Sequence, residues 1–424
     1  MQPAPVEQPA AAAQEACDLD YLLTFLHWTG TMRHPRAGPL ASRAYQAANA
    51  AVTLAFVYFV CSQAVVLFRG GTSDLDSFTL TLSLIDTQGT WLVRIRHIAA
   101  LQPQFHRLAY QVSAVGRDFG QFASAEDVAF LRAGSRRMRV VMLLYLAFGL
   151  AECCVWLTAP ASETGLPFVL ALPYDVTRPV AYVATAVYCC FITLHTIMAN
   201  FAADAFNASL IVQLRMQLTL LSRNIINCNN VTEKSYSLLD KAESVDGVRP
   251  CHPFSTSDVY YRLQKNILHH QAIIRNVELL QRCLGSILLG QSLSIGISVC
   301  FQLYQVAKNA ESLQDAGKYS SYLFTMFAEL FVYCWFADDL ISESENVAQA
   351  AYDAVPSLLE CPTSIKRSLL ILMQRAQRPL SLTAAGLFPL SRESFVSGTP
   401  SYPGWSEFLQ DTPALPPCHH FDEM

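Results

Sequence analysis

Long apolar segments without charged residues recur along this chain. Residues 44–68, 179–203 and 283–307 each run for 25 positions without an Asp, Glu, Lys or Arg. A membrane-spanning helix needs about 20 predominantly apolar residues, whereas a helix of a soluble protein needs a polar face toward water. These three segments therefore predict membrane-spanning helices and disfavour the buried core of a soluble α-helical protein.

Three further apolar segments hold one acidic residue each: Asp86, Glu152 and Glu329. The segment around Asp86 is the weakest of the six. Ionisable groups in lipid are costly and are usually paired or functional, so each acid predicts either an interhelical hydrogen bond or contact with an ion or ligand. The pattern predicts an all-α, polytopic membrane protein with six spans, at about 45–68, 77–95, 139–158, 179–203, 283–307 and 319–337.

Composition agrees with this fold class. Hydrophobic residues make up 52% of the 424 residues and charged residues 15%, against about 25% charged residues in an average soluble domain. The net charge of −5 offers no basic field for nucleic acid. The 13 cysteines show no C-x-x-C spacing, which predicts buried thiols rather than a disulfide framework.

Catalytic and cofactor motifs are missing from the sequence. There is no H-E-x-x-H, no G-x-G-x-x-G, no P-loop and no G-x-S-x-G. The pair His269-His270 has no converging metal-ligand partners in the sequence, so we expect it on the surface. The chain is therefore predicted to be no enzyme and to need no cofactor or metal.

Lysine and arginine are distributed very unevenly between the two sides of the predicted spans. Of the 29 basic residues, four lie in the loops of one side and 25 on the other. The positive-inside rule places the N-terminus in the cytoplasm. A G-protein-coupled receptor would have the opposite orientation, and a transporter would show internal repeats with broken helices, which the sequence lacks.

Two helices are predicted to continue far below the membrane. Residues 180–246 contain no Gly or Pro, so a helix over 180–226 would reach about 70 Å at 1.5 Å per residue. Residues 254–284 also lack Gly and Pro and carry one apolar stripe. The stripe consists of Tyr260, Leu263, Ile267, Ile274 and Val277. We expect these two helices to pack together in the cytoplasm.

Four strings resemble the insect odorant receptor family. LPYDVTRPVAY at 172–182 is similar to the family's second outer loop, and HHQAIIRNVELLQ at 269–281 to the helix that leads into its fifth span. FAELFVYCWFADDLISESENVAQAAYD at 327–353 resembles the sixth span and the turn after it, and SLLILMQRAQRPLSLTAAGLFPLSRESF at 368–395 the segment before the seventh. A gustatory receptor of the same superfamily is the nearest alternative.

The resemblance implies a tetrameric, odorant-gated cation channel in the plasma membrane of olfactory sensory neurons. In that family a ligand-binding subunit assembles with a shared co-receptor subunit. This chain lacks the co-receptor's enlarged fourth loop, so it resembles a ligand-tuning subunit that detects small volatile molecules. We expect the pocket between the outer halves of spans two to six, with contacts from Trp156, Tyr182, Tyr322 and Phe327. Trp156 could equally belong to an aromatic belt at the membrane interface.

The resemblance breaks at the C-terminus. We divide the chain into a disordered tail at 1–20, an odorant-receptor-like domain at 21–397 and an atypical tail at 398–424. The last tail contains five prolines, which remove backbone donors and break a helix in lipid. The sequence therefore predicts that the family's pore-lining seventh span is absent, through a truncated transcript, a splice form or a misread exon, and that this form is channel-defective.

Overall fold

A computed structural model of the chain describes most of the predicted receptor domain. The described residues are 19–35, 38–70, 75–120, 125–158, 165–229, 256–308, 313–359 and 361–397. Of the predicted N-terminal tail only the last two residues fall in these ranges, and the tail at 398–424 lies outside them.

The described residues form long helices and a single short hairpin. The first helices are α2 Asp20–Trp28, α3 Pro39–Gly70, α4 Leu75–Ala100, α5 Gln102–Gly120 and α6 Ala125–Thr158. They are followed by α7 Pro179–Ile226, the 3-10 turn η1 Asn227–Asn229, α9 Thr256–Lys308 and α10 Leu313–Asp353. The last elements are η2 Pro356–Leu358, α11 Thr363–Ala376, β1 Thr383–Ala384, β2 Phe388–Pro389 and α12 Arg392–Ser397.

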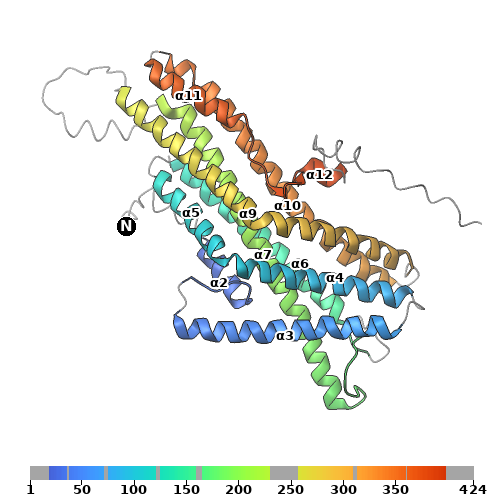
Figure 1. Ribbon diagram of the computed structural model, residues 1–424. Coiled ribbons are helices and arrows are strands. Elements are labelled where there is room, and N and C mark those ends of the chain that lie inside the picture. Colours follow the sequence, from blue (N-terminus) through green and yellow to red (C-terminus); the bar gives the residue numbers. More distant parts are fainter. Residues whose placement is uncertain are drawn as a thin grey trace, which may run out of the picture.

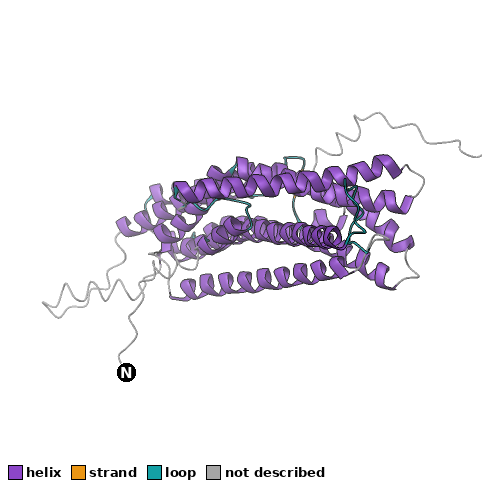
Figure 2. Ribbon diagram, turned by 90° about the horizontal axis from the view of Figure 1, so that it is seen from below, coloured by secondary structure: helices purple, strands orange, loops and turns teal. Residues whose placement is uncertain are grey.

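Each of the six predicted spans lies within one helix, in the order α3, α4, α6, α7, α9 and α10. Among the described residues, four helices, α3, α6, α7 and α9, are long and apolar enough by length and composition alone to cross a membrane. Helices α4 and α10 carry more polar residues but lie in the same elongated bundle (Figures 1 and 2). The predicted all-α, polytopic fold class is confirmed.

The predicted extensions beyond the membrane are present as continuous helix. Helix α7 has 48 residues and ends at Ile226, with Asn227 as its C-cap, as the sequence predicts. Helix α9 has 53 residues and runs without a break from Thr256 into the fifth span. Helices α7, α9 and α10 converge toward α11 at the upper left of Figure 1. Their packing confirms the predicted association of the two long helices.

The main apolar core lies in this part of the bundle and is built around α7. Every residue from Phe201 to Leu214 is buried, and a helix that is buried on all sides must be surrounded by neighbours. In the predicted stripe of α9, Leu263 and Val277 are buried and Ile267 and Ile274 pack against the core.

Two expectations about α9 were wrong. His269 and His270 are 1% and 4% exposed, so the predicted surface position is incorrect. Tyr260, expected to be part of the buried stripe, is 48% exposed. Helix α9 is buried over a wider arc than its single apolar stripe indicates, because α5, α7, α10 and α11 all contact it.

The hairpin β1–β2, which precedes α12, is hydrogen-bonded to α9. Gln281 Nε2 donates to the Thr383 carbonyl (2.9 Å), and its Oε1 accepts from the Thr383 amide (2.8 Å). The Ala385 amide donates to the Gly285 carbonyl at 3.0 Å. Beyond the hairpin, Arg392 of α12 pairs with Asp338 and Asp339 of α10. The segment that resembles the approach to a seventh span is thus tied to the fifth and sixth spans.

Glycine allows α6 to approach α7 closely. A Cβ added at Gly149 would overlap the ring of Phe201, and one added at Gly134 would overlap the sulfur of Met216. Small residues at such crossings are typical of helix packing in membranes, where association depends on van der Waals contact. The aromatic ring of Phe201 is rigid, whereas the end of Met216 can move aside.

We expect Gly149→Ala to destabilise the receptor by about 1–3 kcal/mol, because overpacking outweighs the gain of about 1 kcal/mol in helix propensity. The matched control is Gly290→Ala on α9, where an added Cβ meets nothing within 4 Å. The thermal midpoint of purified receptor in detergent checks both variants. A Gly149→Ala midpoint equal to or above that of Gly290→Ala would contradict the close packing.

Candidate functional site

A second apolar core occupies the middle and outer part of the predicted spans. It joins α3, α4, α6 and α7 with the segment that follows α6. Its buried residues are Phe56, Phe59, Trp91, Ile95, Trp156, Phe168, Cys189, Ile192 and Ala199. We call this set the aromatic core. An apolar, aromatic environment with a few fixed polar groups is typical of small-molecule sites.

Trp156 is the anchor of the aromatic core and is 5% exposed. Its ring stacks with Phe168 at a centroid distance of 6.3 Å and meets Tyr322 edge-on at 5.5 Å. Its Nε1 donates to Glu152 at 2.8 Å. The Lys318 ammonium lies 4.4 Å from the ring centroid, a cation–π geometry. Trp156 therefore contacts its surroundings through its edge, its face and its only donor.

Tyr322 connects the aromatic core to α4. Its partly buried ring lies against Trp156, and its hydroxyl is hydrogen-bonded to Thr87 Oγ1. Glu152, the acid that the sequence places in the third span, also accepts from Ser321 at 3.3 Å. The side chains of α6 and α10 that face one another here are thus held by both polar and aromatic contacts.

The structure brings together two of the four predicted site residues, Trp156 and Tyr322. Tyr182 is 37% exposed near the start of α7, and Phe327 is 42% exposed on α10. The phenolic oxygen of Tyr182 lies 3.5 Å from where a Cβ on Gly165 would be, which places Tyr182 beside the segment that leads to Phe168.

Several buried polar atoms near the aromatic core have no hydrogen-bond partner within the described part of the chain. They are both amide atoms of Gln63, Nε1 of Trp91 and Nδ1 of His195. The Trp91 ring lies 3.9 Å from Phe56 and 5.6 Å from His195 by centroid distance. Buried polar groups normally find a partner in protein, water or ligand, so these atoms are available to a bound molecule.

A ladder of polar side chains joins α4 to α9 from Thr79 to Thr90, on both sides of Thr87, the residue hydrogen-bonded to Tyr322. Polar residues spaced three or four apart on one helix face a matching series on the other. The pairs are Thr79 with Gln305 (2.7 Å), Ser83 with Gln302 (2.9 Å), Asp86 with Ser298 (2.9 Å) and Ser294 (2.8 Å), and Thr90 with Ser294 (3.0 Å). The polarity that makes 77–95 the weakest predicted span is therefore satisfied inside the bundle, and Asp86 makes interhelical hydrogen bonds.

A buried ionic cluster lies below this ladder and joins four helices. Arg94 of α4 pairs with Asp204 of α7 and with Glu329 of α10, the latter at 3.2 Å. Tyr333 of α10 donates to Asp204 at 2.7 Å, and Gln291 of α9 donates to Glu329. Arg94 is 5% exposed and Asp204 2%. The charges are paired within the bundle, as burial requires.

The sequence singled out Glu329 but not its partners Arg94 and Asp204. Arg94 counts among the cytoplasmic loop arginines in the sequence, and Asp204 merely ends the uncharged fourth span. The only signal in the sequence was position, because Arg94 lies at the inner end of the weak second span and Asp204 directly follows the fourth span. Their pairing depends on how α4, α7 and α10 pack, which no local pattern contains.

Comparison with known proteins identifies the family. The sequence model of the 7tm Odorant receptor family matches residues 74–399. The chain belongs to this family. Among curated relatives, Odorant receptor 10 of Aedes albopictus is 32% identical over 133 residues, which cover 31% of this chain and 35% of that one. Odorant receptor Or2 of Anopheles gambiae is 22% identical over 61% of this chain and 64% of its own length.

Full-length similarity is seen with a fly receptor and a solved structure. Odorant receptor 2a of Drosophila melanogaster is 23% identical over 88% of this chain and 92% of its own. The olfactory receptor OR5 of Machilis hrabei superposes with a TM-score of 0.69 over 90% of this chain and 93% of its own, at 15% identity. The same receptor in complex with eugenol gives 0.68. This odorant receptor thus shares the fold of a solved insect olfactory receptor.

Proposed function

We propose that this odorant receptor is the ligand-binding subunit of an odorant-gated cation channel and that small volatile molecules bind in the aromatic core. The contact of Trp156 with Tyr322, and of Tyr322 with Thr87, carries the proposal. A molecule that enters between these rings would change the hydrogen bond between the sixth and second spans. A relative of the same fold is known in complex with eugenol, a small aromatic compound.

The geometry also provides a way for a structural change at the ligand to reach the inner half of the bundle. The pair Thr87–Tyr322 and the pair Arg94–Glu329 are each seven residues apart on α4 and α10. Seven residues are two helical turns, so both pairs lie on the same faces of the same two helices. A shift of α10 against α4 at the odorant would therefore act on the ionic cluster, which also holds α7 and α9.

We propose the remaining partners from the family, and the site residues from the family for Trp156 and Tyr182 and from their depth in the spans for Tyr322 and Phe327. The subunit would assemble with a co-receptor subunit in the plasma membrane, as a ligand-tuning subunit within a tetramer. Trp156 and Tyr322 would contact the ligand directly. Tyr182 and Phe327 remain predicted contacts, on the outer half of the bundle. The unpaired amide of Gln63 would give a polar odorant a donor and an acceptor.

Odorant-evoked current tests the function. Co-expressed with a co-receptor, the 424-residue chain is expected to stay silent to an odorant panel, because the five prolines of residues 398–424 would break a pore-lining helix in lipid. The same chain with the seventh span of a related receptor joined after Ser397 is expected to give odorant-evoked current. A ligand-tuning receptor with a known response, expressed alongside, is the positive control. Silence of the extended form at normal surface expression would contradict the receptor proposal.

Epitope tags test the orientation. We expect a tag at the N-terminus to be stained only after permeabilisation, because 25 of the 29 basic residues lie on that side. A second tag in the segment between α6 and α7 is expected to be stained on intact cells. The reverse pattern would support a G-protein-coupled receptor and reject the proposed topology.

A further inference from the structure

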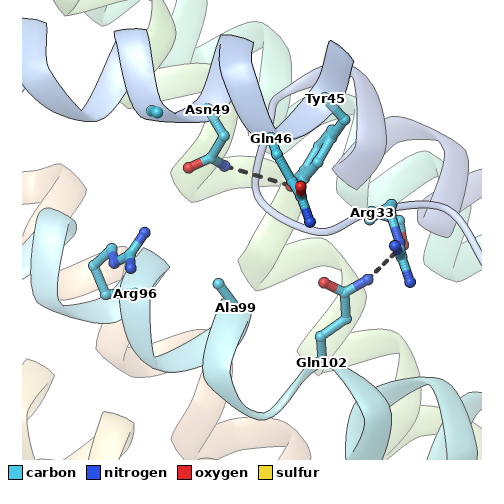
Figure 3. Close-up of a pocket in the computed structure, with 8 residues that line it drawn as sticks. Arg33, Tyr45, Gln46, Asn49, Arg96, Ala99 and Gln102 are labelled. Carbon is cyan, nitrogen blue, oxygen red and sulfur yellow. Dashed lines mark hydrogen bonds between the residues drawn. The ribbon is translucent and has the colours of Figure 1, made fainter. Parts of the chain in front are cut away.

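A half-open cavity of about 310 Å³, with several polar side chains at its wall, lies between the start of α3 and the corner where α4 meets α5. Its polar lining consists of Arg33, Tyr45, Gln46, Asn49, Arg96 and Gln102, and two alanines complete the wall. Figure 3 shows side chains of α3 facing those of α4 and α5 across the space. The cavity is separate from the aromatic core and is large enough for a small polar group.

Positive charge in this cavity has no acidic counterpart. None of the lining residues is Asp or Glu. Arg33 donates from Nη1 to the Ser42 hydroxyl at 2.6 Å. Arg96 makes no hydrogen bond or ion pair with any residue in the described part of the chain. Two guanidinium groups, of part-buried Arg33 and exposed Arg96, thus line one cavity without a carboxylate, whereas Arg94, two residues before Arg96, is buried and paired.

The frame of the cavity is rigid. Gly30 has a φ of +70°, a left-handed conformation that suits glycine, and its carbonyl accepts from Tyr45 at 2.8 Å and from Asn49. Gln102 donates to the Arg33 carbonyl at 3.0 Å. The backbone that carries Arg33 is therefore fixed to α3 on one side and to α5 on the other.

The cavity lies where the proposed topology puts the inner membrane surface. In that topology α3 enters the lipid from the cytoplasm and α4 leaves it there. Close by, Trp28 is 82% exposed and Leu40 81% exposed, and exposed aromatic and apolar residues next to arginines are typical of a membrane interface. The cytoplasmic leaflet carries the anionic lipids, which basic residues attract.

We propose that this cavity binds the phosphate-bearing headgroup of an anionic phospholipid in the cytoplasmic leaflet. Guanidinium groups bind phosphate oxygens through paired, charge-assisted hydrogen bonds. The Gln46 amide and the second amide hydrogen of Gln102 add neutral donors around the same space. The bound headgroup would link α3, α4 and α5 at the inner surface. The site rests on the proposed orientation but not on odorant gating.

Lipid binding by purified full-length receptor tests the proposal. Receptor in detergent is titrated with short-chain phosphatidylinositol bisphosphate, with phosphatidylcholine as the neutral probe, and binding is followed by native mass spectrometry. We expect the double variant Arg33→Gln/Arg96→Gln to bind the anionic lipid about tenfold more weakly. Arg43→Gln, an exposed arginine on α3 outside the cavity, is the control and is expected to leave binding unchanged.

A second variant separates the effect of cavity volume on lipid binding from the effect of positive charge. Ala99→Leu narrows the cavity but keeps both arginines, and we expect it to weaken binding as well, with an unaltered thermal midpoint. Soluble inositol trisphosphate that binds as tightly as the lipid would assign the site to a free phosphate ligand instead. Equal lipid binding by the native receptor, the double variant and Ala99→Leu would overturn the proposal. So would an equal loss in Arg43→Gln, because that loss would reflect general surface charge.

Discussion

Arg94→Met is expected to lower the free energy of unfolding of this odorant receptor by about 3–5 kcal/mol. Loss of one member of a buried ion pair leaves uncompensated charge in a medium of low dielectric constant. Here two carboxylates, Asp204 and Glu329, would lose their common cation while remaining buried. Tyr333 and Gln291 can solvate them only in part, because each donates a single hydrogen bond to one carboxylate.

The measurement is unfolding of purified receptor by denaturant in mixed micelles. Arg107→Met is the matched control: Arg107 is exposed on α5, so its replacement should change the unfolding free energy by less than about 0.5 kcal/mol. The triple variant Arg94→Met/Asp204→Asn/Glu329→Gln should recover part of the loss, because it removes the unpaired charges. If Arg94→Met is as stable as Arg107→Met, the ionic cluster is not a buried pair in the membrane.

The second large effect is expected at Trp156. Trp156→Ala removes a buried ring that contacts Phe168, Tyr322 and Lys318, and we expect the concentration of odorant for half-maximal current to rise at least about 100-fold. Truncation of an aromatic residue at the centre of a binding site commonly costs about 2 kcal/mol or more of binding free energy, and a hundredfold shift corresponds to about 2.7 kcal/mol at 25 °C.

Current recordings from the form that carries a seventh span test this expectation. Trp28→Ala is the control, because Trp28 is 82% exposed and is not part of the aromatic core. Tyr322→Phe keeps the ring but removes the hydroxyl bound to Thr87, so a shift of about fivefold is expected. Tyr182→Ala and Phe327→Ala report on the other two predicted contacts. If Trp156→Ala leaves the half-maximal odorant concentration unchanged at equal surface expression, the ligand binds outside the aromatic core.

Burial explains why sequence and structure agree on three acids of the spans but disagree on His269 and His270. The acids Asp86, Glu152 and Glu329 stood out because isolated charges in apolar segments are costly, and all three make interhelical contacts. His269 and His270 lie in a segment with polar neighbours, so nothing local indicated that α9 would be covered there on several sides. In the same way, nothing local distinguished Arg94, which is buried, from the arginines of the adjoining loop.

The sequence by itself determined where six long apolar segments form helices and that the fourth and fifth of these helices continue well beyond their spans. Charge-free segments of 25 residues and the absence of Gly and Pro between 180 and 246 are local properties, and lipid and backbone hydrogen bonding act on them locally. Only the tertiary structure decided which polar groups meet. The ladder between α4 and α9, the pairing of Arg94 with Asp204 and Glu329, and the contact of Trp156 with Tyr322 join residues far apart in the chain. They arise when helices pack at particular rotations about their axes, and a single sequence does not specify those rotations.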